Sequence, residues 1–311
     1  MGAEDRTVES WRELGQRVSN WGRWGPDDQL GTQNLVTAEH VRAAAQLIRR
    51  GETFDLGIPL DATGPQFGDG RTNPVRLMSV LGGRSADYGA LRYNDDYVFM
   101  PLQAGTQWDA LSHVYYDDVL YNGFPSSSVD RNGAHRLGIE NHAKGVVGRG
   151  VLLDVAAYLQ EEWLSPSHAI SPDELDAVAQ AQGVRVGHGD VVLIRTGWRR
   201  KFAQEGDGRA FLAEEPGIGL ECCAWLKEHD VAAVASDNWA VEVIPSPLAD
   251  EVFPVHMVLI RDMGLLLGEM FDLEALAADC ATDGVYEFFL SAPVLKFTGG
   301  VGSPVNPLAI K

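Results

Sequence analysis

Short apolar segments typical of buried strands alternate along this chain with amphipathic segments typical of helices. Buried strands are predicted over 151–155, 191–196 and 231–236, where Val, Leu, Ile and Ala dominate. Helices are predicted between them, over 172–182 and 220–229. This alternation is typical of an α/β or α+β domain, in which helices cover a sheet. The chain shows no repeat of fixed period.

Capping residues mark two of the helices. Ser171, Pro172 and Glu174 form a capping box that begins the helix over 172–182, and Gly183 follows its end. Thr37 is expected to cap a helix over 38–50. Further short strands are predicted at 53–58, 96–103, 265–267, 286–290 and 294–297.

Residues 64–97 are rich in Gly, Asp, Arg and Asn and lack a clear period. They predict a long surface excursion, of the kind that often shapes a binding site. No shift in composition marks a domain boundary. We therefore expect one globular unit over 51–311, preceded by an N-terminal arm and helix over 1–50.

The charge balance excludes several classes of partner. With 25 Lys and Arg against 44 Asp and Glu, the net charge is −19, which argues against nucleic acid and anionic membrane surfaces. No apolar run reaches 18 residues, and the first residues lack a signal-peptide core. Cys222, Cys223 and Cys280 show no paired spacing and are interpreted as core residues. A cytoplasmic protein with a small-molecule substrate is expected.

The most informative segment is QAGTQWDALSH, residues 103–113. Side chains able to bind a metal or substrate recur at Gln103, Gln107, Asp109 and His113, around a Gly-Thr turn. Such groups at the end of a buried strand are costly unless they are paired. From the spacing alone, a hydrogen-bonded network and a metal or substrate site both remain open.

This segment resembles the signature of the cyclase superfamily, H-x-G-T-H-x-D-x-P-x-H, whose members include kynurenine formamidase and isatin hydrolase. The Gly-Thr turn, Asp109 and His113 match the signature. Gln103 and Gln107 stand in place of two histidines, and Leu111 stands in place of the proline. The resemblance implies a layered β/β/α fold of the swivelling type and a homodimer or homotetramer.

Two further blocks support the resemblance in the expected order. Residues 253–256 (FPVH), Gly264 and Glu269 resemble the later His…Gly…Glu segment of the family. Residues 24–35 resemble the N-terminal arm of its longer members. The resemblance therefore extends over most of the chain.

The family chemistry uses a divalent metal that activates water to attack a carbonyl carbon, usually of an amide or lactam. By position, the resemblance implies that the metal ligands are Gln103, Gln107 and Asp109. It implies proton-transfer or additional metal-binding roles for His113, His256 and Glu269.

The two glutamines leave an alternative open. An oxygen-only ligand set favours Mn²⁺ over Zn²⁺, because Zn²⁺ prefers imidazole and thiolate. Alternatively, the glutamines bind the substrate, and the metal is held by Asp109, His113, His256 and Glu269.

Other candidates have competing structural interpretations. Trp24 and Trp108 could contact a flat substrate or belong to the core, and Asp237 and Asn238 could line the site or stabilise a turn. Arg195 lies within a buried strand and is expected to pair with a carboxylate. The histidines at 135, 142, 168, 188 and 229 are interpreted as surface or loop residues.

The leading hypothesis is a metal-dependent hydrolase that cleaves the C–N bond of a small amide, lactam or aryl formamide. A cyclase, dehydratase or lactone hydrolase at the same site is the second hypothesis, because a fold does not determine a reaction. The third is a non-catalytic small-molecule binding protein with a degenerate metal site. Stoichiometric metal and metal-dependent turnover would distinguish the enzymes from the binding protein.

Overall fold

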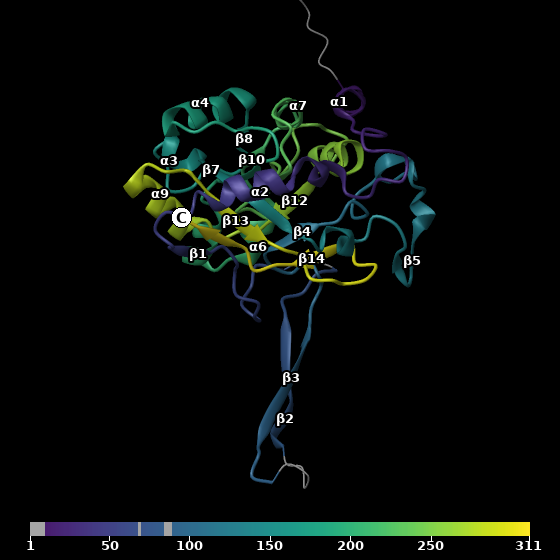
Figure 1. The fold of residues 1–311 in the computed structure, drawn as a ribbon, viewed down its shortest axis with the longest axis vertical. Coiled ribbons are helices and arrows are strands. Elements are labelled where there is room, and N and C mark those ends of the chain that lie inside the picture. Colours follow the sequence, from purple (N-terminus) through teal and green to yellow (C-terminus); the bar gives the residue numbers. More distant parts are fainter. Residues whose placement is uncertain (1–9, 68–69, 84–88) are drawn as a thin grey trace, which may run out of the picture.

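A nine-stranded sheet forms the centre of the computed structural model, which describes residues 10–67, 70–83 and 89–311 (Figure 1). Its strands lie in the order β1 (Thr53–Asp55), β15 (Leu308–Ile310), β13 (Glu287–Ala292), β7 (Val146–Asp154), β9 (Val191–Arg195), β11 (Ala233–Ser236), β12 (Leu266–Glu269), β4 (Gln107–Asp109) and β14 (Gly302–Pro304). The four strands β7, β9, β11 and β12 are parallel, and all other pairs are antiparallel.

Helices connect the parallel strands and cover the sheet. The helices are α1 (Trp11–Val18), α2 (Ala38–Ala45), α3 (Val155–Tyr158), α4 (Pro172–Gln182), α5 (Trp198–Glu205), α6 (Gly208–Ala213), α7 (Cys222–Glu228), α8 (Pro254–His256), the π-helix η6 (Met257–Met263) and α9 (Glu274–Asp283). Short 3₁₀ turns are η1 (Gly31–Leu35), η3 (Tyr121–Gly123), η4 (Ser126–Ser128) and η5 (Ile139–His142). Small two-stranded pairs join β5 (Val129–Asp130) to β6 (Gly133–Ala134) and β8 (Ala169–Ile170) to β10 (Gly217–Ile218). The expected mixed α/β domain is confirmed.

The capping predictions are confirmed. Ser171 Oγ accepts a hydrogen bond from the Glu174 backbone N–H at 3.2 Å, the Glu174 carboxylate accepts one from the Ser171 N–H, and Gly183 ends α4 with φ of 66°. Thr37 caps α2, but this helix ends at Ala45 and does not continue to residue 50.

The core consists of the parallel strands and the helices beside them. All residues of β9 and β11 are buried, as expected when helices cover both faces of a parallel sheet. Cys222, Cys223 and Cys280 are buried free thiols, which confirms their interpretation as core residues. No helix in the described ranges is long and apolar enough to span a membrane.

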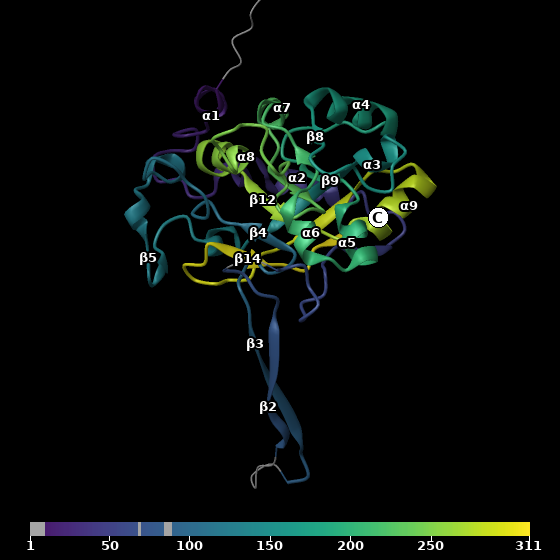
Figure 2. The ribbon, with the colours of Figure 1, turned by 180° about the vertical axis from the view of Figure 1, so that it is seen from behind.

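The strand predictions for residues 96–103 and 294–297 were wrong, and the predicted surface excursion over 64–97 contains β-strands. Residues 64–97 were predicted to form a long surface excursion, and their described part is mostly exposed but contains the regular strands β2 (Val75–Gly83) and part of β3 (Tyr93–Phe99). These strands form a hairpin that projects from the body, so residues 96–99 of the strand predicted over 96–103 are exposed and not buried, and residues 100–103 form no strand (Figures 1 and 2). Residues 294–297 form no strand.

Arg195 has the carboxylate partners that its position required. Its Nη1 lies 2.9 Å from Asp154 Oδ1, and its Nε lies 2.7 Å from Glu274 Oε1. Asp154 ends β7 beside Arg195 at the end of β9. The ion pair therefore fastens adjacent strands to α9, and the structural interpretation of Arg195 is confirmed.

Candidate metal centre

Strands β4 and β12 bring three polar side chains to one face of the sheet. Glu269 pairs directly opposite Gln107, and Asp109 lies two residues beyond Gln107 on the same strand. Directly opposed residues and residues at i and i+2 share a face, so these three side chains converge. Trp108 points to the other face and is fully buried.

His256 reaches this face from α8. The Glu242 carboxylate orients it, accepting hydrogen bonds from the backbone N–H groups of Val255 and His256 at 3.1 and 2.9 Å and contacting His256 Nδ1 at 2.5 Å. The Nε2 atom therefore faces the strands, 3.3 Å from Glu269 Oε1 and 3.8 Å from Asp109 Oδ2.

Two non-glycine residues with left-handed backbone flank the acidic groups. Val241 has φ of 62° beside Glu242, and Met270 has φ of 56° beside Glu269. This conformation is costly for a β-branched residue such as valine and tends to persist where surrounding structure holds it, often at functional sites. Here it turns the chain sharply next to each carboxylate.

Asp109, His256 and Glu269 together form a buried cluster with the chemistry of a divalent-metal site. One ligand atom from each lies within 4.8 Å of the others. Among the described residues, the buried Asp109 Oδ2 atom has no hydrogen-bond partner. Burial, followed by the neighbouring Glu269 carboxylate, raises the pKa of Asp109 well above its usual range. A bound cation would relieve both the burial and the repulsion between the carboxylates.

The carboxylate that contacts the other ring nitrogen of His256 also fits a metal site. A histidine that binds a metal usually gives its other ring nitrogen to a carboxylate, which orients the ring and leaves the free nitrogen as the ligand. Glu242 contacts Nδ1 of His256 in this way. Although burial lowers it, the hydrogen bonds to Glu242 and Glu269 raise the pKa of His256 to about 10. A metal would compete with that proton for Nε2.

The two glutamines occupy different positions around the cluster. Gln107 donates from Nε2 to Glu269 and, at 3.4 Å, to Asp109, while its Oε1 is buried without a partner. Gln103 lies against Gly302 of β14, and its Nε2 is likewise buried without a partner. Gln107 therefore contacts both acidic groups of the cluster through its amide, while Gln103 lies toward the edge strand.

His113 and Arg71 lie beside the cluster. His113 Nε2 is 3.8 Å from Asp109 Oδ1 and 3.4 Å from Arg71 Nη2. Burial, then the charge of Arg71, lowers the pKa of His113 to about 3, so its imidazole is neutral. The Arg71 guanidinium also lies 5.5 Å from the ring centroid of Trp239.

An aromatic wall continues from Arg71. Trp239 packs on Phe253 and Phe253 on His256, with centroid separations of 6.1 and 5.4 Å. The Trp239 indole N–H is buried without a partner. Glu215, whose pKa burial raises well above its usual range, accepts the backbone N–H groups of Trp239 and Ala240 and so holds this turn.

Sequence reasoning missed Arg71, Glu242 and the aromatic wall. Glu242 follows a buried strand by only six residues, which is a usable signal. Arg71 offered none, because it lies in the segment interpreted as a surface excursion. Arg71 and His113 are 42 residues apart in the sequence, so only the folded structure shows that they are in contact.

The remaining candidates contact the backbone and the core. Trp108 packs on Phe271 and donates to the Ala292 carbonyl oxygen, and Trp24 stacks with Arg23 near the surface. Asp237 accepts the backbone N–H groups of Thr196 and Gly197. Asn238 bonds to the backbone at Pro216 and Val241.

Comparison with known proteins identifies the family. The Cyclase family model matches residues 54–243, which is more than half of the chain. The chain belongs to the cyclase family. A crystal structure described as a novel cyclase shares 42% identity and a TM-score of 0.88, covering 94% of this chain and 99% of its own. No curated protein sequence matches the chain.

The cyclase fold is shared with two more distant structures. Isatin hydrolase A from Ralstonia solanacearum is 23% identical, with a TM-score of 0.61 and coverage of 89% of this chain and 98% of its own. A structure described as a predicted metal-dependent hydrolase from Bacillus stearothermophilus is 18% identical, with a TM-score of 0.54 and coverage of 83% and 97%. At these identities the likeness shows the fold.

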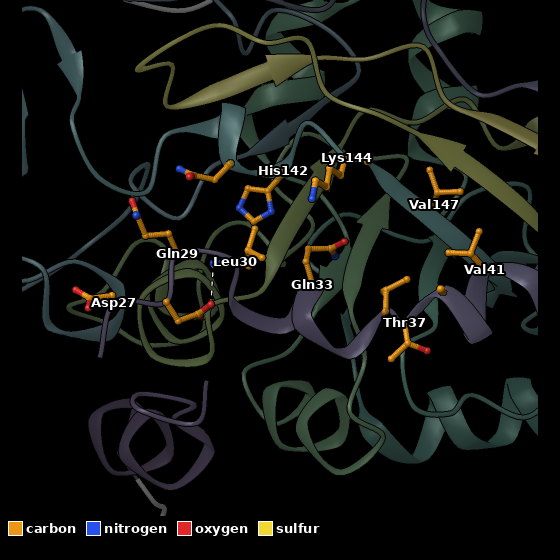
Figure 3. A pocket seen from close by; sticks show the side chains of 14 residues that line it. Asp27, Gln29, Leu30, Gln33, Thr37, Val41, His142, Lys144 and Val147 are labelled. Carbon is orange, nitrogen blue, oxygen red and sulfur yellow. Dashed lines mark hydrogen bonds between the residues drawn. The ribbon is translucent and has the colours of Figure 1, made fainter. Parts of the chain in front are cut away.

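The cyclase also has a cavity of about 600 Å³ that shares no lining residue with the metal cluster. Figure 3 shows Gln29, Leu30 and Gln33 on one side of it and His142 and Lys144 on the other. His142 lies in the short turn η5, as its interpretation as a loop residue expected, but it is buried, and neither ring nitrogen has a hydrogen-bond partner among the described residues.

His142 predicts acid sensitivity. Burial, opposed in part by the charge of Asp28, lowers the pKa of His142 to about 4 from 6.5. Between pH 6.5 and 4 the unfolded chain therefore binds a proton at His142 that the folded state does not bind. The free energy of unfolding is highest above pH 6.5 and decreases as the pH drops toward 4. Urea unfolding at pH 7 and pH 4 should show a loss of about 3 kcal/mol that His142→Leu lacks. Equal losses in both proteins would contradict the prediction.

Proposed function

We propose that this cyclase is a metal-dependent hydrolase that cleaves the C–N bond of a small amide, lactam or aryl formamide. The observation that carries the proposal is the buried cluster of Asp109, His256 and Glu269, with His256 oriented by Glu242. Carboxylates and imidazole are the ligand types that catalytic divalent metals use in proteins.

Asp109, His256 and Glu269 would hold the metal, and the amide of Gln107, which contacts both carboxylates, offers a further oxygen beside them. We propose Mn²⁺ ahead of Zn²⁺, because oxygen donors dominate this set. When bound, such a metal polarises a carbonyl and lowers the pKa of water.

The side chains around the cluster supply the proton transfers that hydrolysis needs. Water adds its oxygen to the carbonyl carbon, the C–N bond breaks, and a proton passes from the water to the departing nitrogen. His113 can accept that proton at a ring nitrogen and return it, because its imidazole lies beside Asp109, next to the cluster. The wall of Trp239 and Phe253 suits a flat or aromatic substrate.

Arg71 is proposed to bind a carboxylate of the substrate or product. Its guanidinium contacts His113 and Trp239 and forms no close ion pair with a carboxylate among the described residues, although its charge acts on Asp109. Arg71→Ala should raise KM for a carboxylate-bearing substrate about 10–100-fold, with a smaller change in kcat, and Arg71→Lys should recover part of this loss. An equal rise in KM for a neutral substrate would contradict the carboxylate role.

The competing functions share the same residues. A lactone hydrolase or a cyclase-type dehydratase would use the same cluster, and a binding protein would use it without turnover. Isothermal titration of purified, metal-stripped protein with Mn²⁺ and Zn²⁺, followed by assays on aryl formamides, isatin and lactones, separates them. One metal per chain and metal-dependent C–N cleavage are expected. Absence of metal binding and of turnover would overturn the hydrolase.

A further inference from the structure

A second cavity, of about 310 Å³, lies beside Glu242, between α1, α7 and the chain that leads into α8. Figure 2 shows these three helices at the same end of the molecule, opposite the β2–β3 hairpin. Protein interiors are close-packed and hold few voids larger than a water molecule. A cavity of this size therefore has room for a ligand.

The apolar walls of this cavity come from separate parts of the chain. They are α1, the segment 220–224 at the start of α7, the segment 243–248 and α8, and the apolar lining residues include Leu14, Leu220, Ala224, Val243, Leu248 and Val255. Leu14, Val243 and Val255 are buried, whereas Leu220 and Leu248 are half-buried. The cavity therefore extends from half-buried side chains into the core.

The charged residues of the lining suit an uncharged ligand. Arg17 and Glu221 are exposed and have opposite charges, so together they favour neither an anion nor a cation. Glu242 is buried, both of its carboxylate oxygens accept hydrogen bonds from the backbone, and its charge faces His256. A buried carboxylate repels an anion, and an unpaired charge is costly to bury.

The volume of the cavity indicates an aromatic ring system. An apolar cavity of about 150 Å³ stays dry and binds benzene. A volume of about 310 Å³ therefore has room for two fused rings. A rigid, flat molecule also loses less conformational freedom on binding than a flexible chain does.

The wall of the cavity also holds His256 in place. The backbone N–H of Val255 donates to Glu242 Oε2 at 3.1 Å, and both residues line the cavity. The same carboxylate accepts the backbone N–H of His256 at 2.9 Å and contacts its ring. Because α8 has only three residues, a molecule packed against Val255 and Glu242 would restrict the turn that carries His256.

We infer that this cavity binds a small, uncharged aromatic molecule and that its occupancy strengthens metal binding by Asp109, His256 and Glu269. The bound molecule stabilises the arrangement of α8 in which His256 faces the cluster, which is the arrangement that a metal binds. Linkage makes the effect reciprocal, so the metal strengthens binding of the aromatic molecule by the same factor. The effect on the metal rests on the proposed function, whereas the cavity site does not.

Equilibrium dialysis of the metal-free full chain against naphthalene tests the cavity site. About one naphthalene per chain should bind, with a Kd below about 100 µM. Ala224→Phe and Leu248→Trp fill the cavity from two different walls, so each should raise this Kd at least about 10-fold. Ala203→Phe adds the same ring to a separate groove beside α5 and should bind naphthalene as the wild type does. Circular dichroism should confirm that the variants are folded.

Two further comparisons assign the binding to this cavity. Trp239→Ala removes part of the aromatic wall beside the metal cluster and should leave the Kd for naphthalene unchanged. Decanoate, a flexible anion, should bind at least about 10-fold more weakly than naphthalene. Absence of naphthalene binding, its loss in Trp239→Ala, its persistence in both filled variants, or tighter binding of decanoate would each overturn the cavity site.

Calorimetric titration with Mn²⁺, in the presence and absence of naphthalene, tests the effect on the metal. Naphthalene should raise the Mn²⁺ affinity of the wild type about five-fold or more and should not change that of Leu248→Trp. Equal Mn²⁺ affinities of the wild type with and without naphthalene would overturn the coupling. A wild type that binds naphthalene but no Mn²⁺ would overturn the proposed metal centre and uphold the cavity site.

Discussion

Replacing Asp109 by Asn should abolish metal binding and hydrolysis while leaving the fold intact. The substitution keeps the shape of the side chain but removes a fully buried negative charge at the centre of the cluster. We expect metal affinity to fall at least about 100-fold and kcat/KM at least about 1,000-fold. Calorimetric titration with Mn²⁺ measures the first effect, and the assay that detects wild-type turnover measures the second.

A matched control separates the metal role from a general effect of losing a buried carboxylate. Asp190 is also buried, but it pairs with Arg149 on the opposite part of the sheet. Asp190→Asn should lower stability and retain full metal stoichiometry. If Asp109→Asn binds Mn²⁺ as tightly as the wild type, the cluster is not the metal site.

Replacing Arg195 by Met should produce the largest loss of stability. The substitution leaves Asp154 buried at the end of β7 without its cation. Breaking one partner of a buried pair strands the other charge, which costs about 3–5 kcal/mol of unfolding free energy. Chemical denaturation monitored by tryptophan fluorescence measures this loss.

An exposed ion pair supplies the comparison. Arg200 pairs with Glu162 at 3.2 Å, and both side chains are well exposed to solvent. Arg200→Met removes the same type of charge and should change stability little, since exposed pairs are screened by water. The double substitution of Arg195 and Asp154 by apolar residues should recover part of the loss. Equal effects of Arg195→Met and Arg200→Met would contradict a structural role for the buried pair.

Local chemistry explains which elements could be predicted. The helix over 172–182 was predicted with its correct ends because Ser171, Glu174 and Gly183 act within a few residues of one another. The hairpin was not, because its apolar residues alternate with polar ones and glycines in a segment that no described residue of the same chain covers. The run at 96–99 was interpreted as buried because apolar sequence usually is.

For the candidate site, too, the sequence predicted individual residues but not their arrangement. The segment 103–113 identified Asp109 and His113, and the later block identified His256 and Glu269, since each motif is contiguous. Which of these form the cluster depends on the pairing of β4 with β12, strands that lie about 160 residues apart. Whether Gln103 and Gln107 bind metal or substrate remains a prediction that the titrations address.

The sequence by itself determined the α/β class, the capped helix, the buried strands and the residue types suited to a metal, because these depend on local periodicity and short-range chemistry. Only the tertiary structure decided that Glu242 orients His256, that Arg71 reaches His113, and that the β2–β3 hairpin stands uncovered. Each of these contacts depends on strand register and chain crossing, and a register shift of one residue would turn Gln107 and Asp109 to the opposite face.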